Sequence, residues 1–433
     1  MSQVAAVPST LVLEQMTPFQ WRAVALCVLL TMLDGFDVMA MAFTAPHVSA
    51  EWALSGKTLG MLFSAALVGM TVGSLGLAPL ADRIGRRPMI LWCLAILTVG
   101  MAASALATSA WQLAALRALT GLGIGGMLAC VAVITAEYAN PRWRNTALAL
   151  QATGYPIGAT VGGALAAELL LHWGWPSVFL LGAAGSLLCI PLVSALLPES
   201  LAFLIARRPT DALTRLNALL TRMRMSPRGV LPPAATQDGA ARGYAALFTA
   251  TQWRQSVLIA LAFFMLMFTF YFVLNWTPKL LVNAGLSAAQ GVTGGVLLNL
   301  GGIAGGAMLS ALAARVPMTR LTAVSLLGSA AVMVAFGAYS ARLDWAFGLA
   351  VLTGVLMFGA IAGMYAVAPC LYDATVRSTG MGWAIGVGRI GAILSPLCVG
   401  VLVDAQWPPS TLYLVCAAPL LLATAAVLGV RRT

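Results

Sequence analysis

Long apolar stretches alternate with short polar turns along almost the whole chain, and each stretch is as long as a membrane-crossing helix. A bilayer core takes about 20 apolar residues per helix. The pattern predicts an all-α integral membrane protein with twelve transmembrane helices, six in each pseudo-symmetric half. The runs lie near 20–46, 58–80, 88–108, 111–138, 143–171, 175–197, 255–279, 287–314, 319–341, 344–370, 378–403 and 408–430.

The composition agrees with this interpretation. The 433 residues are 61% hydrophobic and only 9% charged, whereas about a quarter of the residues of a soluble domain are charged. These values exclude a soluble globular or disordered protein. The seven cysteines all fall in apolar runs without metal-ligand spacing, so we expect neither a metal site nor a disulfide.

The basic residues divide unequally between the two sides of the predicted membrane. Nineteen of the 24 lie on the side of the N-terminus, whereas the other side has Lys57, Lys279 and Arg342. This positive-inside bias predicts that both termini are cytoplasmic in the bacterial inner (plasma) membrane. It also accounts for the net charge of +11 without nucleic-acid binding. Arg117 and Arg389 are the two that lie within helices.

One long polar segment divides the chain. We predict an N-terminal six-helix half (1–197), a cytoplasmic linker (198–254) and a C-terminal six-helix half (255–433). The linker contains an amphipathic helix, with Leu216 and Met223 on its apolar face, which we expect to lie on the membrane surface.

The two halves resemble each other at an offset of about 232–234 residues. Residues 138–146 align with 372–379, and 157–159 with 390–392. An internal duplication of this kind predicts a substrate site near the membrane midplane, between the halves.

The loop after the second span, GSLGLAPLADRIGRRPMIL, resembles the loop signature of the major facilitator superfamily. We expect Gly73 and Gly76 to let two helices approach closely, and the charges of the loop to latch a gate. The equivalent stretch of the second half, GGAMLSALAARVPMTRL, has no acidic residue. The predicted gating residues are Gly76, Asp82, Arg83, Gly85, Arg86, Arg87, Glu137, Arg144, Asp373 and Arg377.

Within that superfamily, the first span is similar to the aromatic acid:proton symporter family, which has Asp-Gly-x-Asp at this place. Asp34, Gly35 and Asp37 match that motif. The stretches RALTGLGIGG, AEYANPRWR, PESLAFL and GVGRIGAILSP are further similarities. The resemblance implies proton-coupled import of a small aromatic carboxylate of the benzoate or hydroxybenzoate type.

Asp34 and Asp37 are three residues apart, so they share a face of the first helix. Two carboxylates in a low-dielectric site cannot both ionise at low cost, and we therefore expect this pair to carry the coupled proton. The alternative is a helix cap, or a pair that stabilises a kink beside Gly35.

The two arginines within the helices are the candidates for the substrate's carboxylate. Arg389 lies near mid-membrane, and its planar fork suits bidentate pairing. Its competing role is a permanent counter-ion for Asp34 or Asp37. Arg117 lies nearer the outer end of its span, either as a second substrate or coupling charge or as a residue that packs helices.

Aromatic and amide side chains are predicted to shape the rest of the site. Rings offer stacking surfaces to an aromatic substrate, and amides and hydroxyls offer hydrogen bonds. The candidates are Tyr271, Asn299, Tyr365, Gln151 and Tyr155.

No enzymatic constellation and no phosphate-binding loop is apparent. We therefore predict a secondary transporter rather than an enzyme, with protons as coupling ion, no other cofactor and function as a monomer in the bilayer. A proton-coupled drug exporter and a symporter of a linear dicarboxylate such as muconate remain as alternatives.

Overall fold

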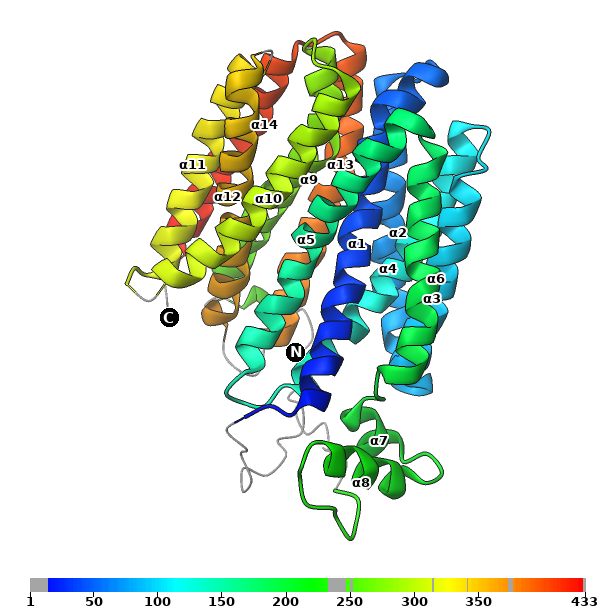
Figure 1. Cartoon of the computed structure of the whole chain (residues 1–433). Helices are drawn as coiled ribbons and strands as arrows, with labels where there is room; N and C mark the ends of the chain where they lie inside the picture. Colours follow the sequence, from blue (N-terminus) through cyan, green and yellow to red (C-terminus); the bar gives the residue numbers. More distant parts are fainter. Residues whose placement is uncertain are drawn as a thin grey trace.

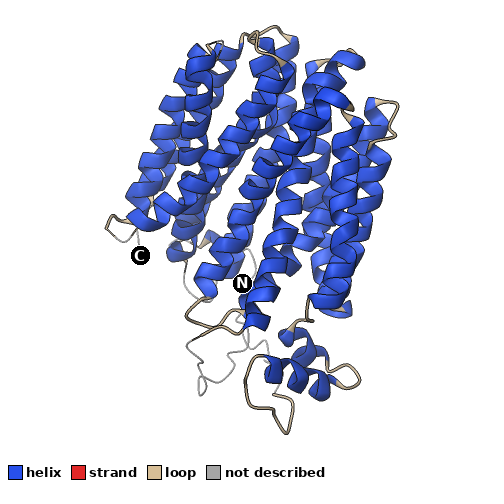
Figure 2. Ribbon diagram, in the orientation of Figure 1, coloured by secondary structure: helices blue, strands red, loops and turns tan. Residues whose placement is uncertain are grey.

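The computed structural model describes residues 15–232, 247–249, 252–313, 315–340, 342–372 and 377–430, and each regular element in these ranges is a helix (Figure 1, Figure 2). Twelve of the helices are long and apolar enough to cross a membrane. The first six and the last six form two bundles that stand side by side (Figure 1). The predicted fold class is confirmed.

The helices of each bundle follow one another in the chain, and two short helices lie between the bundles in sequence. The N-terminal bundle comprises α1 (Pro18–Glu51), α2 (Gly56–Ile84), α3 (Arg86–Ser104), α4 (Ala110–Tyr138), α5 (Arg144–His172) and α6 (Pro176–Leu196). The short helices are α7 (Leu201–Arg207) and α8 (Ala212–Arg222). The C-terminal bundle comprises α9 (Trp253–Asn283), α10 (Ala288–Leu312), α11 (Met318–Tyr339), α12 (Leu343–Val367), the 3₁₀ turn η3 (Ala368–Leu371), α13 (Arg377–Asp404) and α14 (Pro409–Gly429).

The first helix is longer than its predicted span, because α1 continues through Pro46 to Glu51. The extension is held by α6 and the turn before it. Trp175 donates its indole N–H to the Glu51 carboxylate at 2.7 Å, and the Trp52 and Trp175 rings meet edge to face at 5.3 Å. Tertiary contacts therefore stabilise a final turn that the apolar pattern alone does not predict.

The N-terminal end of α1 and the C-terminal end of α14 lie at the same end of the molecule, together with α7 and α8 (Figure 1). We call this the termini end, and the other the opposite end. The apolar face of α8, with Leu216 and Met223, is buried in the same cluster as Phe19 of α1 and Leu201 of α7. The expectation that this face lies on the membrane surface is wrong, because it packs against the N-terminal bundle.

The same glycine contacts recur in both bundles and join α2 to α4 and α10 to α12. At each glycine a Cβ would overlap a backbone carbonyl of the partner helix, so the close approach requires glycine. Gly76 has no atom within 4 Å of a Cβ position, so its predicted close approach is wrong here. The recurring pairs are Gly69–Ala118 and Gly73–Leu122 in the first bundle and Gly301–Val351 and Gly305–Val355 in the second.

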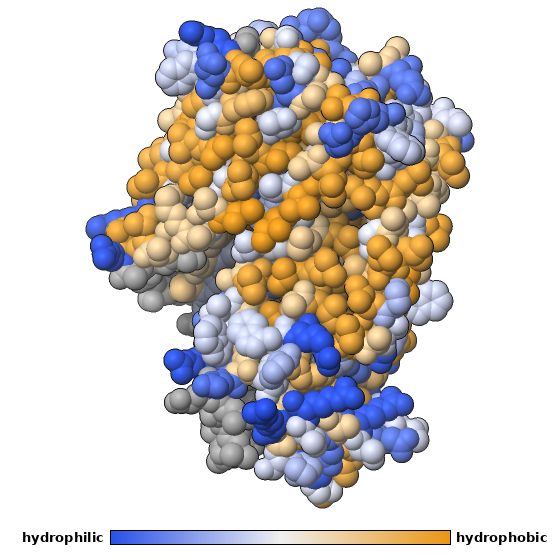
Figure 3. All heavy atoms as spheres, viewed as in Figure 1, coloured by the Kyte–Doolittle hydropathy of each residue, from blue (hydrophilic) through white to orange (hydrophobic). Residues whose placement is uncertain are grey.

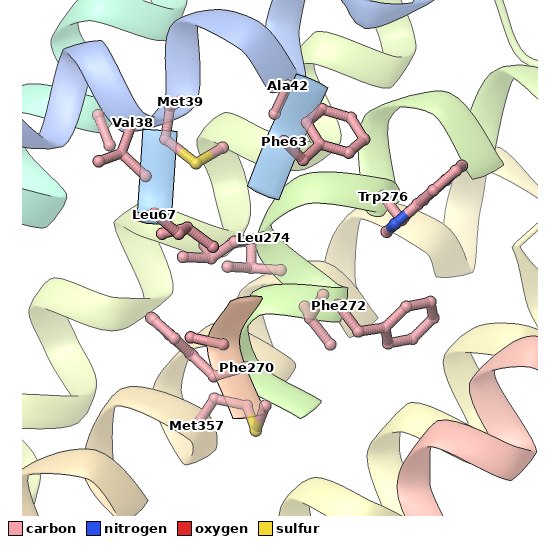
Figure 4. Close-up of a cluster of buried hydrophobic side chains, with 14 of the residues drawn as sticks. Val38, Met39, Ala42, Phe63, Leu67, Phe270, Phe272, Leu274, Trp276 and Met357 are labelled. Carbon is pink, nitrogen blue, oxygen red and sulfur yellow. The ribbon is translucent and has the colours of Figure 1, made fainter. Parts of the chain in front are cut away.

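Large side chains fill the place where the bundles meet. Phe63 of α2 and Trp276 of α9 contact edge to face at 5.4 Å, and Leu67 and Met39 are buried close by (Figure 4). The outer surface shows a broad hydrophobic band between hydrophilic ends (Figure 3). Apolar surface of this extent requires lipid contact, and the chain is a multi-pass membrane protein.

Candidate functional site

Asp37 and Arg117 form an ion pair inside the N-terminal bundle. The two terminal nitrogens of Arg117 donate to the two carboxylate oxygens of Asp37 at 2.7 and 2.9 Å, and one also donates to the Asp37 carbonyl at 2.7 Å. The two side chains are 0% and 1% exposed. The Phe179 ring lies 5.8 Å from the guanidinium. Both charges are thus neutralised away from water, as a buried ion pair requires.

Asp34 lies one turn earlier on α1 and has very different surroundings. The residue is 3% exposed, and its Oδ1 has no hydrogen-bond partner in the described part of the chain. Its charged neighbours are Asp37, on the same helix, and Arg389, on α13 of the other bundle. An anionic carboxylate that is buried without hydrogen bonds is costly. This carboxyl group is suited to taking up and releasing a proton.

Arg389 lies among aromatic hydroxyl groups at the boundary between the bundles. Its half-buried guanidinium interacts electrostatically with Asp34, Tyr271 of α9 and Tyr365 of α12. Tyr365 is 44% exposed although the Phe263 ring packs edge-on against it at 5.4 Å. A cation near a buried carboxyl and polar rings can bind an aromatic anion.

Tyr155 of α5 is the aromatic residue that the N-terminal bundle adds to this group. Gly35 lies against the backbone of Tyr155, and this close approach sets the ring beside Asp34 and Tyr271. Its ring centroid is 6.5 Å from that of Phe358 on α12. The Tyr155 hydroxyl has no hydrogen-bond partner among the residues described, so it can bond a substrate.

The side-chain amides of Gln151 and Asn299, both predicted to line the site, form hydrogen bonds within the helical bundles instead. Gln151 donates its side-chain N–H to the Thr31 hydroxyl at 2.8 Å, which joins α5 to α1. Asn299 is fully buried and donates to the Gly295 carbonyl of its own helix at 2.9 Å. The structure therefore groups Asp34, Arg389 and the three tyrosines, while Arg117 pairs with Asp37 instead.

Helices α2 and α13 are in close contact near the opposite end. The Ser64 hydroxyl donates to the Ile393 carbonyl at 2.7 Å, and Gly60 lies against the Pro396 carbonyl. At the tip, the Asp404 carboxylate accepts hydrogen bonds from the backbone N–H groups of Gly56 and Lys57, the latter at 2.9 Å. These contacts close the opposite end.

Toward the termini end the same two helices separate. Gly382 and Gly386 continue the face of α13 that carries Ile393, yet a Cβ at either would meet no atom within 4 Å. Leu75, which continues the face of α2 that carries Ser64, is 74% exposed. Arg389 lies between the closed and the separated parts of α13. The molecule is therefore open toward the termini end and closed at the opposite end.

The loop between α2 and α3 belongs to a charged network at the termini end. Arg86 bonds Asp82 at 3.1 Å and Glu137 at 2.9 Å, and Ser200 donates to Glu137 at 2.7 Å. Glu199 accepts from the backbone N–H groups of Arg86 and Arg87 at 2.9 and 3.1 Å, at the start of α3. Gly85, with φ of 106°, makes the sharp turn between the two helices.

Other predicted gating residues surround this network. Arg83 is exposed, Arg87 donates to the Ser194 carbonyl, and Arg144 donates to the Ala136 carbonyl at 3.1 Å. Asp373 lies outside the described residues, as does the side chain of Arg377. Glu199 and Ser200 are not among the predicted gating residues, although the stretch PESLAFL, with an acid and a helix-capping serine after a span, is a signal for them.

A family model described as Major Facilitator Superfamily matches residues 27–369. The chain belongs to this superfamily. It is a transporter by family and fold, not an enzyme.

Curated relatives of this major facilitator match over nearly its whole length. It is 32% identical over 424 residues to the 4-hydroxybenzoate transporter PcaK of Pseudomonas aeruginosa, covering 96% of this chain and 93% of the relative. It is 32% identical to the gallate transporter of Pseudomonas putida, covering 95% and 92%, and 29% identical to the benzoate transport protein of Acinetobacter baylyi, covering 91% and 86%.

Solved structures support the fold. The xylose transporter XylE of E. coli in an inward open conformation superposes with a TM-score of 0.75 at 15% identity, covering 95% of this chain and 96% of that one. An inward-facing bacterial homologue of the human lysosomal transporter Spinster gives a TM-score of 0.69 at 19% identity, covering 96% and 99%. At these identities the likeness concerns the fold of the major facilitator alone.

Proposed function

We propose that the protein imports an aromatic carboxylate of the benzoate or hydroxybenzoate type together with a proton, by alternating access. The names of its relatives, carriers of 4-hydroxybenzoate, gallate and benzoate, support this substrate class. The observation that carries the proposal is the Arg389 guanidinium, a half-buried cation that interacts electrostatically with Asp34 of one bundle and with Tyr271 and Tyr365 of the other.

In this proposal the substrate's carboxylate pairs with Arg389. The guanidinium fork offers two parallel donors to one carboxylate, which fixes orientation as well as charge. Tyr271 and Tyr365 then flank the substrate, while the free hydroxyl of Tyr155 is available to a ring substituent. The aromatic surfaces favour a ring over a linear chain.

Asp34 carries the exchangeable proton, and Asp37 keeps its charge. Arg117 already supplies Asp37 with a bidentate partner, so protonation of Asp37 would leave a buried cation without its anion. Asp34 shares Arg389 with the substrate anion. When the substrate occupies the guanidinium, Asp34 loses its counter-charge and protonation becomes favourable, which couples the two binding events.

The proposed sidedness follows from charge. We place the termini end in the cytoplasm of the bacterial inner membrane, because α7, α8 and most of the basic residues belong to that side. The open state then faces inward. The network of Asp82, Arg86 and Glu137 would act as the gate at that end, in a protein that works as a monomer with protons as coupling ion and no further cofactor.

Uptake into proteoliposomes tests the proposal. Labelled benzoate, 4-hydroxybenzoate, muconate and a sugar are compared with and without an imposed pH gradient. We expect the aromatic acids to accumulate only with the gradient, and the sugar not to accumulate. Preference for muconate would replace the aromatic acid by a linear dicarboxylate, and proton-driven movement of hydrophobic drugs alone would favour an exporter.

Labelling tests the sidedness. A cysteine at Thr210, between α7 and α8, should resist an impermeant thiol reagent in intact cells and react after the membrane is opened. Rapid labelling of Thr210→Cys in sealed cells would reverse the proposed orientation.

A further inference from the structure

A pocket that is separate from the residues around Arg389 lies at the opposite end of the molecule. Its volume is about 480 Å³, within the range of small-molecule sites. Both bundles line it, through the end of α1, the start of α2 and the ends of α9 and α13. The lining residues used below are Trp276, Lys279, Asn283, Asp404 and Trp407.

The pocket has a cation without a counter-ion. Lys279 is half-buried and forms no ion pair with any described acidic residue. The acid that lines the same pocket, Asp404, has its carboxylate bound by the backbone N–H groups of Gly56 and Lys57 at the start of α2. A half-buried ammonium group attracts an anion more strongly than one in bulk water does.

A second donor and an aromatic surface complete the lining. Trp276 is fully buried, and its indole N–H has no hydrogen-bond partner in the described ranges. A buried N–H group without a partner is costly and favours an acceptor. The Trp407 ring is 39% exposed, and Asn283 adds an exposed amide. A cation, an unused N–H and an accessible ring suit a carboxylate attached to an aromatic group.

The pocket lies on the path into the central site. Trp276 and Lys279 follow Tyr271 on α9 by five and eight residues, which corresponds to about 7 and 12 Å along a helix. Trp276, which lies between Tyr271 and Lys279 on α9, packs edge to face against Phe63 of α2 (Figure 4). Anything that enters from the opposite end meets Lys279 before it meets Arg389.

We propose that this pocket is an outer subsite that binds the aromatic carboxylate before the opposite end opens. The carboxylate lies toward the ammonium of Lys279 and the indole N–H of Trp276, and the ring lies against Trp407. This inference rests on the proposed import of aromatic acids and adds a capture step to it.

The test is the initial rate of labelled 4-hydroxybenzoate uptake, with an imposed pH gradient, into liposomes where the protein has one orientation. Lys279→Gln should raise KM about tenfold, the effect of losing a hydrogen bond to a charged group, and change the maximal rate less than twofold. Lys279→Arg should restore most of the affinity. Arg342→Gln, which removes a charge at the same end but outside the pocket, should leave KM unchanged.

The second measurement compares the KM for uptake with the KM for efflux. Substrate loaded from the termini end reaches Arg389 before it reaches the pocket, so efflux by Lys279→Gln should keep the wild-type KM. An unchanged uptake KM in Lys279→Gln, or an equal rise in Arg342→Gln, would overturn the subsite while leaving aromatic-acid import intact. If the wild type carries no aromatic acid, the proposed function itself fails.

Discussion

Two aspartates one turn apart on α1 differ in which bundle supplies their arginine. Asp37 pairs with Arg117 of α4, in its own bundle, through two carboxylate hydrogen bonds. Asp34 has an oxygen without a hydrogen bond and forms no ion pair within the described residues, and the positive charge that acts on it is Arg389, on α13 of the other bundle. In the proposed alternating-access cycle, α1 and α4 would move together, whereas α1 and α13 would move relative to each other. On that proposal, the surroundings of Asp34 change and those of Asp37 do not.

This difference assigns distinct tasks to two identical side chains. On the proposed mechanism, a charge pair inside one bundle keeps both partners in every state, and removing one partner would leave a costly unpaired charge. A charge shared across the moving boundary responds to the state and to the substrate, as coupling requires. The following substitutions separate the two tasks.

The largest effect should come from Arg117→Ala. It leaves the Asp37 carboxylate unpaired at a site that is 1% exposed, which costs about 3–5 kcal/mol. We expect a strongly lowered unfolding midpoint in detergent and little folded protein. The double variant Arg117→Ala, Asp37→Asn should recover much of the stability, because no buried charge remains. Wild-type stability of the single variant would contradict a structural role.

Arg389→Ala should leave folding intact but lower affinity for the acid about 100-fold, because two charge-assisted hydrogen bonds are lost. Arg389→Lys should lose less, since it keeps the charge without the fork. Equilibrium binding of labelled 4-hydroxybenzoate and of its neutral amide measures this. If the acid and the amide lose affinity equally, Arg389 is structural.

Asp34→Asn should uncouple transport while preserving substrate binding. The amide cannot release a proton, so accumulation driven by a pH gradient should vanish, and exchange of substrate across the membrane should persist without pH dependence. Uptake and counterflow in the same liposomes distinguish the two. Undiminished proton-driven accumulation in Asp34→Asn would remove this residue from the mechanism.

Tyr271→Phe should have the smallest effect. It removes a hydroxyl near Arg389 and keeps the ring, so we expect affinity to fall about fivefold, as for one neutral hydrogen bond. Tyr339→Phe, at an exposed position of α11, is the matched control and should bind as the wild type does. Equal affinities of the two variants would place the Tyr271 hydroxyl outside the site.

The charged loop between α2 and α3 shows how much of a gate a local sequence motif can predict. The loop motif predicts that Asp82 and Arg86 belong to one charged latch, and the structure adds that these two side chains form an ion pair at 3.1 Å. The same motif does not reveal that Glu199 accepts the N–H groups at the start of α3. That contact joins residues more than a hundred positions apart, and no periodicity connects them.

The apolar pattern by itself determined the twelve helices, their grouping in two halves and the two arginines and two aspartates inside the membrane, because lipid requires long apolar runs and makes each buried charge conspicuous. The partners of these charges were decided by the tertiary structure. The sequence offers Arg389 as a counter-ion for either aspartate, and it does not show that Arg117 is the partner of Asp37. Helix packing brings Arg117 of α4 to Asp37, and the meeting of the two bundles leaves Arg389 of α13 as the positive charge nearest in effect to Asp34. A bidentate ion pair needs positions within a few tenths of an ångström, and such positions exist only after the helices have packed.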